Sequence, residues 1–196
     1  GELSCSALST ATAITALALL DRGRGRADHA GVVEAGARWL AANQNSDGGW
    51  GDTDKSFSNI STTLLAWSAL GAASATVAAS ATALAGGHQE TVGRAEQWNT
   101  GHAGGLAPDA VAAAEINRYE PDRTFSVPIL TMAALCGRMG DGPAAWRSVA
   151  QLPFELAVLP RSWFGRLNLQ VVSYALPALI AIGQARHHHR PTRNPL

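Results

Sequence analysis

Apolar residues recur every three or four positions along most of the chain, which is the spacing of one face of an α-helix. The first run comprises Ala7, Ala11, Ile14, Leu17 and Leu20, and it predicts a helix over residues 6–21 that stops at Asp21-Arg22-Gly23. Further helices are predicted over residues 30–43, 89–99, 108–119, 126–138 and 168–185, with a short helical turn at 143–150. Another helix is predicted to start at Asn59 or Ser61. The residues after it, 72–86, are almost all Ala, Ser, Thr, Val and Gly and are also predicted to be helical. No strand pattern competes, so the predicted fold class is all-α.

Proline sharpens these boundaries. Ser126 followed by Pro128 is a start signal, because proline is tolerated in the first turn of a helix. Pro177 falls inside the last predicted helix and is expected to kink it. Residues 186–196, which contain Arg190-Pro191, are expected to form an extended exit segment.

Composition narrows the class of protein. Hydrophobic residues make up 46% of the chain and charged residues 15%, against roughly 25% in ordinary soluble domains, which excludes disorder for its bulk. Fifteen basic and fifteen acidic residues cancel, so a nucleic-acid partner is not expected. The two uncharged runs that come nearest to a membrane span, 56–89 and 171–183, are too polar or too short to cross a bilayer.

Cysteine and histidine offer no metal site. Cys5 and Cys136 cannot form a disulfide framework or a paired zinc motif, and are expected to be buried free thiols. The run His187-His188-His189 places three side chains on one segment, where they rarely converge on one ion. We therefore expect no metal and no cofactor.

One turn-rich segment carries a recognisable motif. The stretch WLAANQNSDGGW, from Trp39 to Trp50, resembles the QW repeat of triterpene cyclases, with Gln44 five residues after the aromatic residue and Gly48 two residues before the tryptophan. A Gln at one helix end can bond the polar groups of a neighbouring helix end, Gly48 permits a tight turn, and Trp50 can lie over the Gln. The resemblance implies a structural role for these residues.

Other segments resemble squalene-hopene cyclases in the same order. They are GELS at 1–4, STTLLAWSAL at 61–70, LPFEL at 152–156 and VSYALPAL at 172–179. The resemblance implies a bacterial protein of two α/α barrels, of which residues 1–196 form the inserted γ barrel. Because the chain begins at Gly1 and not at a methionine, we expect it to belong to a longer protein.

The family resemblance also implies a reaction. Class II cyclases protonate a polyprene such as squalene and close its rings in one cavity, so the implied partners are that substrate and the second (β) barrel. The implied location is cytoplasmic, with peripheral contact to the inner membrane face left open.

The family's acid lies in an Asp-x-Asp-Asp motif of the other barrel, and this chain contains no catalytic residue of that kind. Its nearest string, Asp52-Thr53-Asp54-Lys55, is expected to be a solvated loop or a helix cap, and Glu155 a helix-start carboxylate.

A few side chains are candidates for the cavity wall. Phe125, Met132 and Leu135 lie on or beside the helix predicted over 126–138, and Tyr174 lies on the last predicted helix. Ordinary core packing is the alternative reading of all four. Trp163-Phe164 is expected to pack against the second barrel or to dip into a membrane interface.

The sequence is also compatible with two other functions, a binding module and a prenyltransferase subunit. The chain can be a non-catalytic helical module, derived from the cyclase barrel, that binds a lipid or a protein partner. A protein prenyltransferase subunit shares the barrel, but its chemistry needs a zinc set of Asp, Cys and His, and neither Cys5 nor Cys136 has a suitable His partner.

Overall fold

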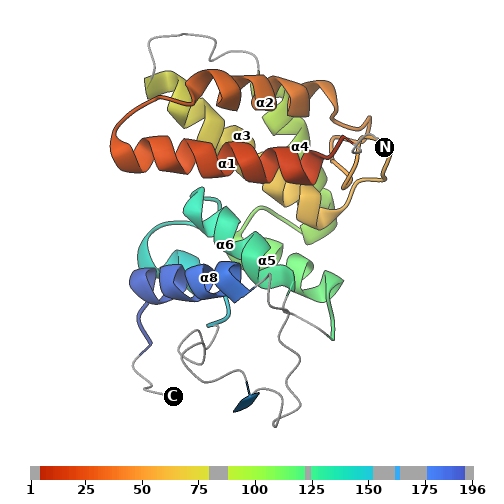
Figure 1. Cartoon of the computed structure of the whole chain (residues 1–196). Helices are drawn as coiled ribbons and strands as arrows, with labels where there is room; N and C mark the ends of the chain where they lie inside the picture. Colours follow the sequence, from red (N-terminus) through yellow and green to blue (C-terminus); the bar gives the residue numbers. More distant parts are fainter. Residues whose placement is uncertain (1–4, 80–87, 122–124, 152–161, 164–175, 193–196) are drawn as a thin grey trace.

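The helices of the computed structural model carry all of the regular structure in the residues it describes, which are 5–79, 88–121, 125–151, 162–163 and 176–192 (Figure 1). This confirms the all-α class. In chain order the elements are α1 (Ala7–Arg24), α2 (Ala30–Ala42), α3 (Ile60–Ala79), α4 (Gln89–Ala103), α5 (Pro108–Arg118), α6 (Ser126–Leu135), the 3-10 helix η2 (Gly142–Trp146) and α8 (Leu176–His189).

Helix α3 is the centre of the fold. It packs against α1, α2, α4, α5 and α6, and every residue from Ile60 to Leu70 is buried. A helix that is buried on all sides belongs to the interior of a protein, and its many Ala, Ser and Thr residues let neighbours approach closely. In Figure 1, α1, α2, α3 and α4 form one group and α5, α6 and α8 a second, and α3 also contacts α5 and α6 of that second group.

Of the two predicted starts of α3, Asn59 and Ser61, the structure confirms Asn59. The side-chain oxygen of Asn59 accepts a hydrogen bond of 2.9 Å from the backbone amide of Thr62, which makes Asn59 the N-cap. Ser61, the other candidate, lies inside the helix and is buried.

Helix α1 ends later than the sequence predicts. It runs past Gly23 to Arg24, because the residue that adopts the left-handed conformation is Gly25, with φ of 61°. The amides of Gly25 and Arg26 donate back to the carbonyls of Arg22 and Asp21, over 3.2 and 3.0 Å. A glycine ends a helix only where the backbone turns left-handed, so the expected stop at Gly23 was wrong.

A buried carboxylate ties α1 to α2. Asp21 is 1% exposed, and its two oxygens accept hydrogen bonds from the backbone amide and the Nδ1 of His29, over 2.8 and 2.7 Å. Burial alone would raise the pKa of Asp21, but the hydrogen bonds from His29 outweigh burial and lower that pKa. The pair fixes the turn between α1 and α2.

The C-terminal helices agree with prediction at the start of α6 and differ at the end of α8. Helix α6 begins at Ser126 as expected. Helix α8 continues to His189, so the exit segment expected from residue 186 is wrong over its first residues. Arg186 explains the extra turn, since its side chain donates to the carbonyl oxygens of Val149 and Arg190. Pro177 lies in the first turn of α8, and the helix expected before it falls outside the described residues.

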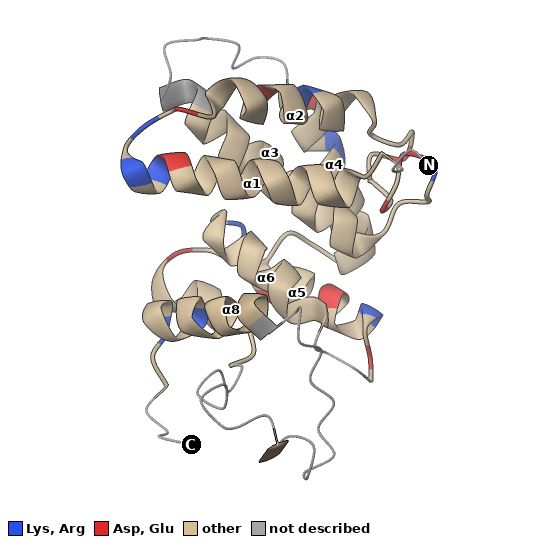
Figure 2. Cartoon of the chain, viewed as in Figure 1, with Lys and Arg blue, Asp and Glu red and all other residues tan. Residues whose placement is uncertain are grey.

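Charged residues are sparse on the helices. Figure 2 shows most of the ribbon uncharged, with basic and acidic residues together near the C-terminal end of α1. Among the described residues, no helix combines the length and the apolar character needed to cross a membrane.

Candidate functional site

The segment that resembles a QW repeat, Trp39 to Trp50, begins in the last turn of α2 and continues into a compact loop. This loop joins α2 to α3 over residues 43–59, and we call it the QW loop. The amide of Asn45 donates to the carbonyl of Gly49 over 3.0 Å, and the amide of Gly48 donates to the carbonyl of Asn45 over 2.9 Å. Gly48 has φ of 91°, and a Cβ atom there would lie 2.8 Å from the carbonyl oxygen of Arg94. Only glycine fits, both for the turn and for the close approach to α4.

Gln44 connects the end of α2 with the start of α4. Its side-chain nitrogen donates to the carbonyl oxygens of Gly48 and Thr91, each over 2.9 Å. Thr91 lies in the first turn of α4. A Gln that bonds the end of a neighbouring helix is the arrangement expected from the sequence.

Trp50 connects the same loop with α2 and α3. Its side chain lies in the core at 1% exposure, and its indole nitrogen donates to the carbonyl of Leu40 over 2.9 Å. The Trp50 amide donates to the hydroxyl of Thr63 over 3.0 Å. Trp39, the first residue of the motif, is half-buried and packs against the core.

Helix α4 holds the outer side of the QW loop. Arg94 donates to the carbonyl oxygens of Asn45 and Ser46 over 2.8 and 3.0 Å, and the indole of Trp98 donates to Asp47 over 3.0 Å. Burial would raise the pKa of Asp47, but hydrogen bonds from the Gly49 amide, Ser58 and Trp98 lower it. The QW loop is therefore a polar clamp on three helices. Sequence reasoning missed its partners on α4, since no local spacing signals contacts with residues so distant along the chain.

The string that comes nearest to the cyclase acid motif lies in the QW loop, where its first residue supports the cap of α3. Asp52 Oδ1 accepts hydrogen bonds from the Thr62 hydroxyl over 2.6 Å and from the side-chain nitrogen of Asn59, the N-cap, over 3.0 Å. These bonds lower the pKa of Asp52, against a smaller opposing effect of burial. A carboxylate held in its ionised form is a poor proton donor, and Asp54 and Lys55 beside it are exposed. Glu155 lies outside the described residues.

The residues predicted to line a cavity do not gather at one site. Met132 and Leu135 are half-buried on α6 and pack against the core, and the Leu135 carbonyl accepts a hydrogen bond from Arg22 over 3.0 Å. Phe125 is 61% exposed, with its ring 5.7 Å from that of Tyr119. Tyr174 lies outside the described residues.

A buried carboxyl group that sequence reasoning missed lies between α3 and α5. Glu115 is 0% exposed, and both its oxygens lie 3.0 Å from the hydroxyl of Ser61, which is also 3.1 Å from the hydroxyl of Tyr119. One hydroxyl proton satisfies one acceptor at a time, so the site solvates a carboxylate poorly.

Burial dominates the electrostatics of this carboxyl group. It raises the pKa of Glu115 to about 7, and the hydrogen bond from Ser61 and the charge of Arg118 oppose it only partly. The spacing of residues along α5 could have revealed this group, because Glu115 falls on the same helical face as the buried residues Val111 and Ala112. A glutamate on the apolar face of a helix is expected to be buried.

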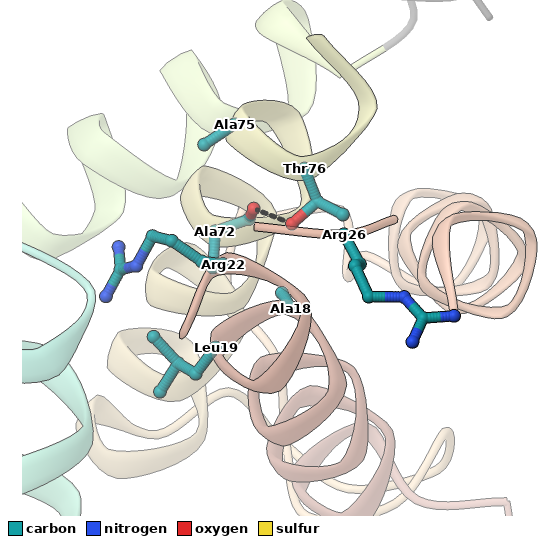
Figure 3. A pocket seen from close by; sticks show the side chains of 7 residues that line it. All are labelled: Ala18, Leu19, Arg22, Arg26, Ala72, Ala75 and Thr76. Carbon is teal, nitrogen blue, oxygen red and sulfur yellow. Dashed lines mark hydrogen bonds between the residues drawn. The ribbon is translucent and has the colours of Figure 1, made fainter. Parts of the chain in front are cut away.

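A small cavity lies between α1 and α3 near the end of α1 (Figure 3). Its volume is about 80 Å³, room for only a few water molecules. Ala18, Leu19, Ala72 and Ala75 form much of its wall, while the guanidinium groups of Arg22 and Arg26 point away from each other. The cavity is far smaller than the roughly 300–1,000 Å³ of usual ligand pockets.

The cysteines, the histidine run and Trp163 were the other residues that the sequence singled out. Cys5 is an exposed free thiol, contrary to the expected burial, and Cys136 is half-buried. His189 stacks on Trp146 with ring centres 4.5 Å apart, and the described residues hold no cluster of side chains suited to a metal ion. Trp163 is 52% exposed.

Comparison with known protein families, with curated proteins and with solved structures finds no match to this chain. The family resemblance therefore rests on the sequence motifs alone.

Proposed function

We propose that this chain is a structural barrel domain of a class II terpene cyclase of the squalene-hopene type. In this proposal its helices form an α/α barrel that supports the wall of a cavity for a polyprenyl substrate such as squalene. The observation that carries it is the QW loop, in which Gln44 and Trp50 join the end of α2 to α3 and α4. A clamp of this kind suits a domain that must hold its shape around a reacting carbocation.

Two carboxyl groups of the described residues support a non-catalytic role for this domain. Asp52 is held ionised by its hydrogen bonds, and Glu115 is sealed in the α3–α5 contact. Protonation of an alkene needs a strong carboxylic acid in contact with the substrate. In the proposal that acid belongs to the second barrel, which also packs against this one.

The test uses the complete protein. Its reading frame is expected to encode an Asp-x-Asp-Asp motif and further QW repeats outside these residues. Purified complete protein, incubated with squalene and with shorter polyprenes, is expected to yield cyclic products of unchanged mass, identified by gas chromatography and mass spectrometry. Replacing the acid of that motif by Asn is expected to abolish the products. A complete reading frame without the motif, or no cyclisation of any of these substrates, contradicts the proposal.

Exposed aromatic side chains favour a second candidate, a helical module that binds a lipid surface. Phe57 is 96% exposed, and Phe125 and Trp163 are exposed over more than half of their surface. Solvent-exposed aromatic rings are common where proteins contact partners or membranes. Co-sedimentation of the chain with phosphatidylglycerol vesicles, lost in Phe57→Ser, supports this candidate, and cyclisation by the complete protein supports the first.

A further inference from the structure

A second, larger cavity lies among α3, α4 and the turn that follows α6. Its volume is about 260 Å³, enough for a small organic molecule. Its wall comprises Gly71, Ser74, His88, Gln89, Val92, Gly93, Glu96 and Arg138. Its described wall includes a guanidinium, Arg138, and a carboxyl group, Glu96, whereas the charged side chains that line the small cavity beside α1 are both arginines.

Trp67 fixes the two charged groups of this cavity. The guanidinium of Arg138 lies 4.0 Å above the Trp67 ring, and its Nη2 donates to the Trp67 carbonyl over 2.9 Å. The indole nitrogen of Trp67 donates to Glu96 over 3.1 Å. Both charges are thus held in place before any ligand arrives, which lowers the entropic cost of binding.

Arg138 keeps an unused donor. Its Nε is buried and has no hydrogen-bond partner within the described residues. Burial lowers the pKa of Arg138, and the nearby charge of Glu96 opposes that effect. Gly71 makes room for the guanidinium, since a Cβ atom there would lie 2.6 Å from Nη2. Because Nε has no acceptor, the protein stabilises the charge of Arg138 incompletely, and a ligand carboxylate against the guanidinium would stabilise it further.

His88, at the start of α4, adds a polar side chain to the cavity wall. Both of its ring nitrogens are buried without a hydrogen-bond partner in the described part of the chain. Nε2 faces the carboxyl group of Glu34, with 3.5 Å between Nε2 and Oε1. The N-terminal end of α4, which is 15 residues long, adds its positive dipole end on the same side.

We propose that this cavity binds a small zwitterion of the α-amino-acid type. The ligand carboxylate lies against the guanidinium of Arg138, beside the start of α4, and its ammonium group lies against Glu96. A lone anion in this site would meet Glu96, and a lone cation would meet Arg138, so a site lined by both charges favours a molecule that carries both. This inference is independent of the proposed function.

Binding is tested on the chain with glycine and L-alanine as probes, and with acetate and ethylamine as single-charge controls. Isothermal titration calorimetry is expected to give saturable binding of an amino acid at millimolar concentration or below, and much weaker binding of either control. The amino acid is also expected to raise the melting temperature, because it binds only the folded chain. No saturable binding of either amino acid, or acetate binding as tightly as glycine, overturns the proposal.

Two variants locate the ligand. Glu96→Gln keeps an acceptor for Trp67 and removes the charge, so glycine affinity is expected to fall about tenfold or more while acetate affinity does not fall. Gly93→Leu fills the cavity, since a Cβ atom there meets no heavy atom within 4 Å, and is expected to abolish binding. Gly101→Leu on the same helix, with equal open space and outside the cavity, is the matched control and is expected to bind normally. Full binding by folded Gly93→Leu overturns the proposal.

Discussion

The indole nitrogen of Trp50 lies 2.9 Å from the carbonyl oxygen of Leu40, and both side chains are buried. Leu40 is in the last turn of α2, and its carbonyl also accepts a hydrogen bond from the backbone amide of Asn43 over 3.2 Å. The tryptophan therefore adds a second hydrogen bond at the end of α2 with a side chain that also fills the core between α2 and α3.

Removing this side chain is expected to be costly. Trp50→Ala is predicted to lower the free energy of unfolding by about 3–5 kcal/mol, because it leaves a cavity in the core and removes the buried hydrogen bond to the Leu40 carbonyl. Trp50→Phe keeps most of the packing and loses the hydrogen bond, so a cost of about 1–3 kcal/mol is expected. Urea unfolding measures both. Trp163→Ala, at a half-exposed ring, is the control and is expected to stay within about 0.5 kcal/mol of the unchanged chain.

Gly48 is expected to tolerate no side chain. Gly48→Ala adds both a left-handed conformation, at about 1–2 kcal/mol, and a collision with the Arg94 carbonyl. Gly104→Ala separates the two effects, because Gly104 has φ of 75° and open space around its Cβ position. Gly48→Ala is therefore predicted to lose clearly more stability in urea unfolding than Gly104→Ala. Equal losses would show that the contact with Arg94 adds nothing.

Glu115 gives stability a pH dependence. Burial raises its pKa from 4.5 to about 7 in the folded chain, so the folded state holds a proton that the unfolded state has released between these values. Stability is therefore expected to fall as pH rises from 4.5 through 7, by an upper limit of about 3 kcal/mol from this group.

Glu115→Gln removes that titration while keeping the shape of the side chain. The variant is expected to be more stable than the unchanged chain at pH 8, and their difference is expected to shrink towards pH 5. Urea unfolding across this pH range measures it, with Glu90→Gln at an exposed position of α4 as the control. A variant that loses stability at pH 8 contradicts the assignment of the carboxyl group as a buried acid.

Asp21 acts with the opposite sign. Its pKa is lowered in the folded chain by the hydrogen bonds from His29, which outweigh burial. Its contribution to stability is thus present above the unfolded value of 3.8 and is lost as pH falls through the folded pKa. Asp21→Asn is expected to unfold at lower urea concentration at pH 7, with the deficit shrinking in acid. Asp54→Asn, at an exposed position, is expected to unfold like the unchanged chain at both pH values.

Helix positions were predictable where local signals decide them. Ser126 with Pro128 marks the start of α6, and Asn59 is a natural N-cap for α3, because caps depend on neighbouring residues alone. The end of α1 was missed because Gly23 and Gly25 look alike in sequence, and only the backbone conformation tells them apart.

The candidate sites were less predictable because they depend on distant contacts. The role of Gln44 follows from its place at a helix end, but its partner Thr91 lies on another helix. Glu115 carries its own signal on the apolar face of α5, whereas the cavity between Arg138 and His88 arises only when α3, α4 and the turn after α6 are assembled. The spacing of residues along one helix reveals which of its faces is buried, whereas a site built from several helices forms only when they pack together.

The QW loop has no regular secondary structure, yet several of its backbone amides donate hydrogen bonds, as the amides of a helix do. The amides of Asn45, Gly48, Trp50 and Asn59 all donate within the loop or to α3. Amide hydrogens bonded in this way exchange with solvent only when the structure around them opens. These four amides are therefore expected to exchange as slowly as those in the middle of α3, so that loop and central helix open together as one cooperative unit.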